Sequence, residues 1–429
     1  MKRGIPSATI CSTGFVPVAR KVAQSLGVPH LPIIEVHEEV GHDTPAALEE
    51  VARHVSDAVP EILRQYQAQT VRGEQLQDQD RCDAIDIDPG IDLSSRVSEL
   101  FLQENWTDGL PVVPPTEDRV QAMLATVAAP PHEVLGILQP RGGIATVLKV
   151  AVCAVMAGCL PKHFPIVVAA VRAIGTVEFK LRAIQSTAHP YSPFIMVNGP
   201  AGIEAGLSSG HDCTPKGWQA NMAICRAVRL VTINMAGLKD VIASHTHGYV
   251  GCFADCIREN EEESPWAPYH TEKGYPREAS TVTVFPGEAP HLIDDRGSTT
   301  PQSMLTTFAR VIANGGNRSL NGPTQQVLLV APEHANYVAS HGFSKEDVRD
   351  FLYHVARVPI HEFPKDNWDS FSGWHRKLFA NVSEHVTIPV VREKKDLNII
   401  VHGGIGPHSL YVPGCLPANP ATVPVERKA

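Results

Sequence analysis

The sequence predicts an α/β protein, and three observations support this class. Residues 1–66 alternate between short apolar stretches and amphipathic stretches, in the order strand, helix, strand, helix. The rest of the chain carries short, continuous apolar runs that end in glycine, proline or polar turns. Such runs are typical of strands that are buried on both faces. At 429 residues, the chain is also long enough for two or three domains.

The first 66 residues predict a small βαβα domain. Residues 8–11 form a short apolar strand, and Thr13 stands where the first helix opens. Residues 31–36 form a second strand, and Thr44 precedes a proline as an N-cap does at the start of a second helix. Strands that alternate with helices pair in parallel, so we expect half of a flavodoxin-like sheet. Two strands alone do not make a stable sheet, so this domain must be completed by another element or chain.

The remaining residues predict a polar linker and a larger domain. Residues 67–92 are polar and acidic, as in a solvated connection. Residues 93–429 predict the main α/β domain, which we expect to be catalytic. Residues 146–159 are apolar almost all round, as in a buried helix. Ser344 begins a capping box ahead of a helical apolar pattern.

Several polar residues follow buried strands, where open α/β sheets bind their ligands. Glycines in such turns also allow a ligand to approach the backbone closely. Asn198 stands in an Asn-Gly-Pro turn, so a turn-forming role explains it as well as ligand binding does. The substrate-binding candidates are Cys11, Thr13 and Gly14, at a helix N-terminus in the small domain, and His189, Asn198, His402, Gly404, His408 and Ser409 in the main domain.

Residues 244–263 hold the densest group of histidine, cysteine and acidic side chains. Imidazole and thiolate ligands suit Zn, Fe or Cu, although the spacing matches no standard zinc finger. Two packed histidines and two structural thiols are the alternative reading. The metal candidates are His245, His247, Cys252 and Cys256, and the catalytic candidates are His247, Cys252, Glu261 and Glu262.

Composition excludes several other classes of protein. A net charge of −9 with no basic stripe argues against nucleic-acid binding. The apolar runs are too short to span a bilayer, and the first residues contain no secretory signal, so we expect neither a membrane protein nor an exported one. Nine scattered cysteines are typical of a reducing compartment, which favours the cytoplasm. We find no nucleotide-cofactor motif.

Several phrases resemble the UGSC-type (seleno)protein family. The resemblance covers most of the chain in scattered blocks, at residues 3–6, 15–20, 106–116, 154–161, 188–190, 197–200, 259–262 and 264–266. The family takes its name from a selenocysteine- or cysteine-Gly-Ser-Cys motif, which in relatives lies just upstream of the segment that begins here at Arg3. This chain contains no such motif. The resemblance therefore implies that a small partner subunit carries the motif, or that the motif has been dispensed with.

Three functions are consistent with these observations. The first is an enzyme that acts on a small polar organic substrate, by metal- or thiolate-assisted lyase, hydratase or C–heteroatom bond chemistry with Glu or His proton transfer. The second is a thiol or selenol redox protein whose Cys-Gly-Ser-Cys site lies on a partner subunit. The third is a non-catalytic large subunit. In each case we expect a partner subunit, a homo-oligomer or the second domain to complete the N-terminal sheet.

Overall fold

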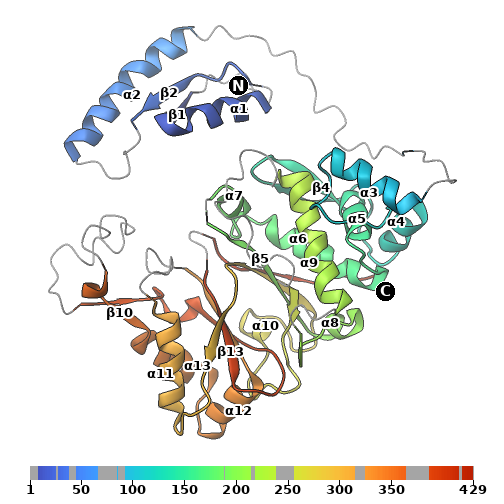
Figure 1. Ribbon diagram of the computed structural model, residues 1–429, viewed down its shortest axis with the longest axis vertical. Helices are drawn as coiled ribbons and strands as arrows, with labels where there is room; N and C mark the ends of the chain where they lie inside the picture. Colours follow the sequence, from blue (N-terminus) through green and yellow to red (C-terminus); the bar gives the residue numbers. More distant parts are fainter. Residues whose placement is uncertain are drawn as a thin grey trace. The chain divides into compact units, whose positions relative to one another are not determined.

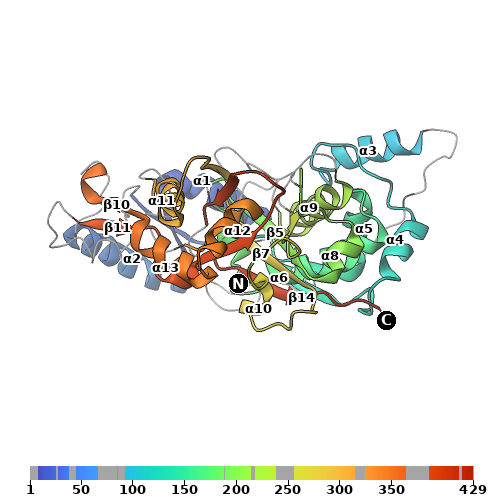
Figure 2. The same cartoon turned by 90° about the horizontal axis from the view of Figure 1, so that it is seen from below.

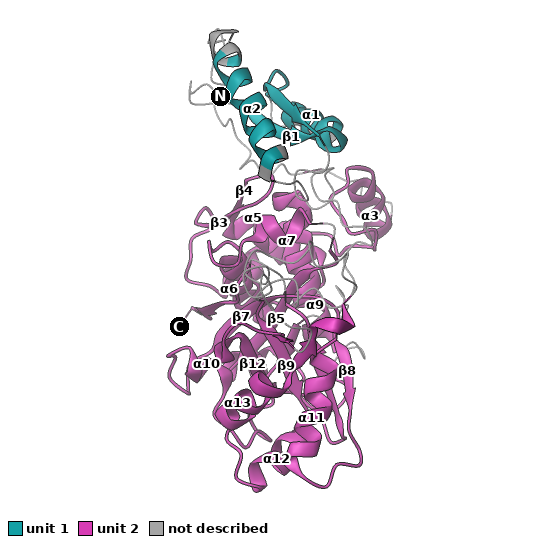
Figure 3. Cartoon of the chain, turned by 90° about the vertical axis from the view of Figure 1, so that its left-hand side faces the viewer, with its two compact units in different colours: residues 1–83, 239–242 teal, residues 84–238, 243–429 magenta. Residues whose placement is uncertain are grey.

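The computed structural model describes residues 8–25, 28–37, 45–65, 85, 92–187, 189–213, 218–237, 256–314, 324–363, 386–414 and 418–428. The chain divides into two compact units (Figure 3). Unit 1 comprises residues 1–83 and 239–242, and unit 2 comprises residues 84–238 and 243–429. The predicted linker lies outside the described residues, apart from Ile85 and Asp92. No helix in the described part of the chain is long and apolar enough to cross a membrane.

Unit 1 contains the predicted parallel strand pair. Its elements are β1 (Thr9–Ser12), η1 (Thr13–Phe15), α1 (Val16–Ser25), β2 (Ile33–Val36) and α2 (Pro45–Gln65). The two strands pair in parallel, with Thr9 opposite Ile33 and Ser12 opposite Val36. Ile34 and Val36 are buried, whereas Ile10 is 57% exposed. The predicted α/β class is therefore confirmed for this segment.

Unit 2 is also an α/β structure, and its sheets are mixed. Its first half contains α3 (Leu93–Gln103), α4 (Glu117–Leu124), β3 (Val134–Leu138), β4 (Gly143–Thr146), α5 (Val147–Met156), η2 (Pro161–His163), α6 (Phe164–Ile174), α7 (Leu181–Gln185), β5 (Ser192–Asn198), α8 (Pro200–Ala205), α9 (Gln219–Val231) and η3 (Thr232–Ala236).

The second half of unit 2 begins at the strand that pairs with β5. Its elements are β6 (Cys256–Arg258), α10 (Tyr269–Glu272), β7 (Thr281–Gly287), β8 (His291–Asp294), α11 (Pro301–Ile312), β9 (Gln326–Val330), α12 (Pro332–Ser340), α13 (Lys345–Val355), β10 (Arg357–Pro359), η5 (Ile360–Glu362), β11 (Thr387–Pro389), η7 (Lys394–Asp396), β12 (Leu397–Val401), β13 (His408–Val412) and β14 (Ala421–Pro424).

Two four-stranded sheets form the centre of unit 2. The first has the strand order β14-β7-β5-β6, in which β5 and β6 are parallel and the other pairs are antiparallel. The second has the order β12-β9-β13-β8, in which β12 and β9 are parallel. Because the strands of a parallel pair run in the same direction, the carboxyl ends of β5 and β6 lie at one end of the first sheet, and those of β9 and β12 lie at one end of the second.

The two sheets pack face to face between two layers of helices (Figures 1 and 2). Helices α6 and α9 cover the outer face of the first sheet, with α5 packed against these two helices, and α11, α12 and α13 cover the outer face of the second. Alternation along the strands explains the layers, because successive side chains point to opposite faces. Within β5, Phe194 and Met196 point into the inter-sheet layer, whereas Ile195 and Val197 point toward the helices. The inter-sheet layer comprises Phe194, Met196, Ile257, Tyr269, Phe285, Val327, Leu329, Ile400 and Val412.

The helices begin where the sequence predicted them. Thr146 caps α5, and its hydroxyl accepts a hydrogen bond from Lys149 N. Seven of the ten residues of α5 are buried, as the apolar pattern predicted. Ser344 and Asp347 form the capping box of α13, with each side chain bonded to the other residue's N–H. These caps satisfy N–H groups that a helix leaves free in its first turn.

Candidate functional site

Three buried polar side chains lie where strands of unit 2 end. Asn198 is the last residue of β5, Glu259 follows β6, and His402 follows β12. The strand alternation that places Met196, Ile257 and Ile400 in the inter-sheet layer places these three residues on the same faces, two positions further on. Asn198 and Glu259 are fully buried, and His402 is 5% exposed. We call this end of the inter-sheet layer the strand-end site.

Asn198 joins two carboxylates at this site. Its Nδ2 donates to Glu259 Oε2 at 2.5 Å and to Glu261 Oε1 at 2.9 Å. Gly199 N also donates to Glu261 Oε1, at 2.8 Å, and Tyr269 N donates to Glu259 Oε2, at 2.8 Å. Among the described residues, Asn198 Oδ1 and Glu259 Oε1 have no hydrogen-bond partner. Glu259 is thus a fixed acid with one oxygen available to a proton or a ligand.

Burial raises the pKa of Glu259 to about 7. The charge of Lys345 and the N–H donors of Tyr269 and Asn198 oppose this shift, and the carboxylate of Glu261 adds to it. A carboxyl whose pKa lies near neutrality exists in both protonation states, which is what proton transfer in catalysis requires. Perturbed carboxyls of this kind occur at functional sites more often than elsewhere.

Backbone hydrogen bonds connect the ends of the two sheets at this point. Asn260 N donates to Val401 O at 2.8 Å, and Asn260 Nδ2 donates to Gly403 O at 3.0 Å. Gly403 N in turn donates to Ser209 O at 2.9 Å. Asn260, the residue after Glu259, is therefore bonded to the residues on either side of His402, so the backbone segments that carry the acid and the imidazole lie side by side.

His402 faces a thiol. Its Nδ1 lies 3.9 Å from Cys213 Sγ, and both residues are 5% exposed. Burial lowers the pKa of His402 to about 4, so the ring is neutral near pH 7. Within the described residues, its Nε2 has no hydrogen-bond partner. The pair supplies a thiol, a neutral base and an open ring nitrogen.

The other predicted residues of the glycine-rich turn have contacts of their own. Gly404 packs against His211, and a Cβ at Gly404 would lie 2.4 Å from Nδ1 of that ring. His408 is exposed in β13, with its Nδ1 3.3 Å from Asp294 Oδ1. Ser409 is buried in the same strand, where its hydroxyl accepts a bond from Ala331 N.

Ser409 also has a histidine neighbour, but this pair belongs to the packing of the second sheet. Its Oγ lies 2.8 Å from His334 Nδ1, and His334 Nε2 lies 3.0 Å from Asp295 O. Because a carbonyl can only accept, His334 Nε2 carries the proton and Nδ1 accepts from the hydroxyl. Both residues are 1% exposed, so this serine is held inside the unit.

Most of the predicted metal ligands lie outside the described residues. These are His245, His247 and Cys252, so the metal and the catalytic roles predicted for them stay predictions. Cys256 is described, and it lies fully buried in β6 on the face that packs against the helices. Among the described side chains, no group of three or more His, Cys, Asp or Glu residues is arranged to hold a metal ion.

The remaining predicted residues have local partners. The backbone N of His189 donates to Thr187 Oγ1 at 3.2 Å, and its ring lies 5.5 Å from that of Tyr191. Glu262 is half-exposed and forms an ion pair with Arg258 at 2.7 Å. Arg258, the last residue of β6, also donates to Ser209 Oγ at 2.6 Å, which ties the end of this strand to residues 207–213.

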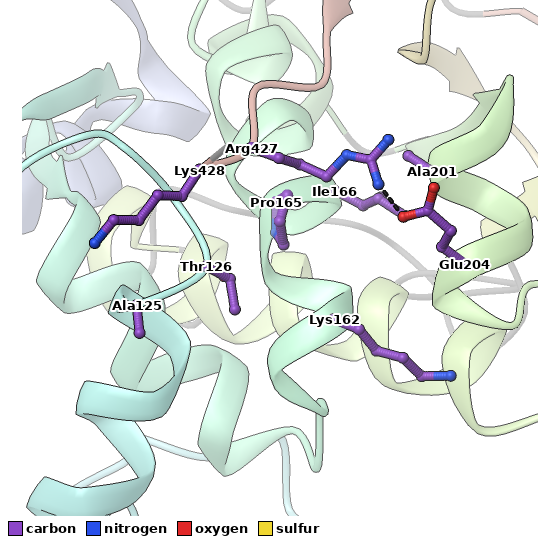
Figure 4. Close-up of a pocket in the computed structure, with 9 residues that line it drawn as sticks. All are labelled: Ala125, Thr126, Lys162, Pro165, Ile166, Ala201, Glu204, Arg427 and Lys428. Atoms are coloured by element: carbon purple, nitrogen blue, oxygen red, sulfur yellow. Dashed lines mark hydrogen bonds and ion pairs between the residues drawn. The ribbon is translucent and has the colours of Figure 1, made fainter.

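A separate cavity of about 320 Å³ lies beside α6 and α8 in unit 2 (Figure 4). Three of its lining residues are cationic, but Arg427 forms an ion pair with Glu204. The side chains of Lys428 and Lys162 extend in opposite directions, and Lys162 Nζ lies close to Gly206 at the end of α8. The positive charges therefore do not converge on one point, and we assign this cavity no ligand.

Comparison with known sequences identifies the N-terminal segment. Residues 1–66 match the sequence model of the UGSC family. This segment belongs to the UGSC family. The match confirms the resemblance at residues 3–6 and 15–20, and it covers the part of the chain that forms β1, α1, β2 and α2. No curated protein and no solved structure matches the chain.

The UGSC segment contains three of the predicted binding residues. Thr13 Oγ1 donates to Val36 O at 3.1 Å, so it links the carboxyl ends of the two strands. Cys11 is half-buried, and its thiol lies 3.5 Å from Ser12 O. Gly14 lies in the exposed turn η1 that leads into α1. Their role in binding stays a prediction.

One block of the wider resemblance has a structural explanation. Asp108, in the segment 106–116, has a fully buried side chain and accepts two bonds from Arg226. The distances are 3.0 Å to Nε and 2.9 Å to Nη2, which is the bidentate geometry typical of strong carboxylate–guanidinium pairs. This segment is thereby fixed against α9.

Sequence reasoning did not single out two residues of the strand-end site. Glu259 is one of four candidate acid/base groups in the charged run, with Glu261, Glu262 and Glu263, and nothing in the run marks which of these carboxyls is buried. Cys213 stands 189 positions from His402, so no local spacing links the thiol to the imidazole. The one available signal was the polar turn after each buried strand, which pointed to Asn198 and His402.

Proposed function

We propose that unit 2 is an enzyme that acts on a small polar organic substrate at the strand-end site. The reaction class is lyase, hydratase or C–heteroatom bond chemistry, with Glu259 and His402 as the proton-transfer groups and Cys213 as the assisting thiol. The observation that carries this proposal is the convergence of a fixed acid and a neutral imidazole, each with one open polar atom, at the end of the inter-sheet layer.

The two groups are suited to opposite directions of proton transfer. Glu259 is protonated in about half of the molecules near pH 7, because its pKa lies near that value, so it can donate to a departing heteroatom. His402 is uncharged at the same pH and can accept a proton. Eliminations and additions of water need such a pair on one substrate.

The proposal assigns proton transfer to Glu259 in preference to Glu261 and Glu262. Glu261 has Oε1 committed to two N–H donors, and Glu262 is half-exposed in an ion pair. Assistance by a metal bound through His245, His247, Cys252 and Cys256 stays part of the proposal as a prediction.

A partner chain is favoured by one feature of the UGSC segment. Ile10, within its first strand, is 57% exposed, and Phe15, in the following turn, is 66% exposed. A subunit that pairs with this sheet would cover such side chains, and the thiol or selenol redox alternative places the Cys-Gly-Ser-Cys motif on that subunit. Co-purification of a small thiol-bearing chain with the tagged protein would support this second candidate.

The enzyme proposal is tested with a library of small polar metabolites. The wild-type protein and the Glu259→Gln variant are incubated with the library, and consumption is followed by mass spectrometry. We expect a compound that the wild type consumes and the variant does not. Equal consumption by both proteins would overturn the proposed role of the strand-end site.

A further inference from the structure

We infer that Cys213 is the nucleophile of the strand-end site, that His402 activates it, and that its substrate presents an electrophilic carbonyl carbon of the aldehyde class. This inference rests on the proposed function and goes further, because it names the attacking atom and the group attacked. It depends on the positions of the two residues and on the bonds that hold them.

The buried side-chain amide of Asn221 holds Cys213 in place. Asn221, buried in α9, donates from Nδ2 to Cys213 O at 3.3 Å and to Cys256 O at 2.9 Å. Its Oδ1 accepts from Ser208 N at 3.1 Å. One side chain therefore ties both ends of the segment from Ser208 to Cys213 to helix α9 and to strand β6. Fixing the nucleophile in this way removes part of the entropic barrier to attack.

His402 is held by the second sheet, at the end of β12. Its backbone N donates to Val330 O at 3.0 Å, and the next residue, Gly403, donates to Ser209 O at 2.9 Å. The second bond cross-links the histidine turn to the cysteine segment. The 3.9 Å separation of Nδ1 and Sγ is thus set by bonds on both sides, and it is within hydrogen-bond reach for sulfur.

The open Nε2 of His402 is the second sign of a ligand. His402 is only 5% exposed, and among the described residues its Nε2 has no hydrogen-bond partner. Buried polar atoms are normally bonded. Nδ1 faces the thiol, so Nε2 is left for a polar group of the substrate beside the carbonyl.

The step needs no other reactant. His402 Nδ1 takes the proton of the Cys213 thiol, and the sulfur pair forms the C–S bond. The π pair of the carbonyl moves to its oxygen, which takes the proton from Nδ1. The product is a hemithioacetal, the ring is neutral again, and nothing has been oxidised or reduced. An aldehyde suits this pair because the addition requires one nucleophile, one proton and no leaving group.

Another thiol of the same unit provides a matched control. Cys225 has the same exposed fraction as Cys213, 5%, but it lies in α9 within the core between that helix and the first sheet. Cys159 gives a second comparison, because burial raises its pKa far above the ordinary value of a thiol. Thiols that differ in activation, and not in burial, should react at different rates.

The test measures alkylation by iodoacetamide at each cysteine, by peptide mass spectrometry on the full-length native protein. We expect Cys213 to react at least about ten-fold faster than Cys225, because His402 Nδ1 can accept the thiol proton as the sulfur attacks. We expect His402→Asn and His402→Gln to bring Cys213 down to the rate of Cys225. Equal rates at the two cysteines of the wild-type protein would overturn the inference without any variant, and so would an unchanged Cys213 rate in both folded variants.

Glyoxylate, a small polar aldehyde, tests the substrate class in the same experiment. We expect it to slow the alkylation of Cys213 and to leave Cys225 unaffected, whereas absence of protection would overturn the carbonyl assignment. Labelling needs no turnover, so the inference and the proposed function can fail separately. Fast labelling of Cys213 without any consumed metabolite would count against the proposed function alone. Turnover that survives Cys213→Ser but not Glu259→Gln would overturn the inference alone.

Discussion

The side-chain amide of Asn198 at the end of β5 donates a hydrogen bond to Glu259 at the end of β6, across an Nδ2–Oε2 distance of 2.5 Å. The second N–H of the same amide bonds to Glu261 at 2.9 Å. One neutral residue thus holds two carboxyls close together, and their mutual repulsion contributes to the raised pKa of Glu259.

The stability of unit 2 should fall as the pH rises through neutrality. Glu259 has a pKa of about 7 when folded and an ordinary value of 4.5 when unfolded, so between these values the folded protein holds a proton that the unfolded chain has released. The free energy of unfolding therefore drops by about 3 kcal/mol from acid to neutral pH through this group. Urea unfolding at pH 5 and pH 8 should show that Glu259→Gln lacks most of this drop.

The control for that measurement is Glu262→Gln. Glu262 is half-exposed in its ion pair with Arg258, so its replacement should leave the difference between pH 5 and pH 8 as it is in the wild type. A Glu259→Gln variant with the full wild-type difference would show that Glu259 is not the buried acid described here.

Asn198→Asp should destabilise unit 2 in a pH-dependent way. The change removes both donors and places a third carboxyl between Glu259 and Glu261. We expect a loss of at least about 2 kcal/mol at pH 8 and a smaller loss at pH 5, where these carboxyls take up protons. Chemical unfolding at the two pH values measures both quantities. A variant as stable as the wild type at pH 8 would contradict the hydrogen-bond assignment.

Gly199→Ala should be far more damaging than Gly210→Ala. Gly199 has φ +77°, and a Cβ there would lie 2.3 Å from Ala279 O, a backbone atom that cannot easily move. We expect a cost of about 3 kcal/mol or more, with loss of the Gly199 N–H bond to Glu261. A Cβ at Gly210 would meet nothing within 4 Å, so that change should stay within about 0.5 kcal/mol. Thermal unfolding of the two variants compares them directly, and similar midpoints would refute the close approach at Gly199.

Arg226→Met should strand a buried carboxylate. Burial raises the pKa of Asp108, but the bonds and the charge of Arg226 outweigh it, so the net shift is downward. Removing the guanidinium should cost about 3–5 kcal/mol, as for other buried pairs that lose one partner. Adding Asp108→Asn to Arg226→Met should recover part of that loss. Denaturant unfolding of the single and double variants checks this, and a double variant less stable than Arg226→Met would argue against the pairing.

Much of the fold could be predicted from local patterns. The alternation of apolar and amphipathic stretches indicated the parallel pair of β1 and β2, and the apolar runs indicated β5, β9 and β12. The face-to-face packing of the two sheets could not be predicted, because a strand buried on both faces has the same apolar pattern whether helices or a second sheet cover it. Periodicity therefore gave the elements and left the layers open.

The strand-end site was predictable only in part. Asn198 and His402 follow buried strands, and that position alone made them candidates. The burial of Glu259 depends on the second sheet and on Tyr269, whose backbone N–H bonds to the carboxylate. The acidic run itself does not indicate these contacts. Cys213 becomes significant only through His402, which β12 brings to it from a distant part of the sequence.

The most direct test of the strand-end site compares kcat/KM for Glu259→Gln and Glu262→Gln on the substrate found in the metabolite screen. Both changes replace a carboxyl by an amide of the same shape in the same short segment. Removing the buried proton donor in Glu259→Gln should lower kcat/KM by about 100-fold or more. Removing the half-exposed carboxylate in Glu262→Gln should change kcat/KM by less than about three-fold. The reverse order, with Glu262→Gln inactive and Glu259→Gln active, would contradict the account.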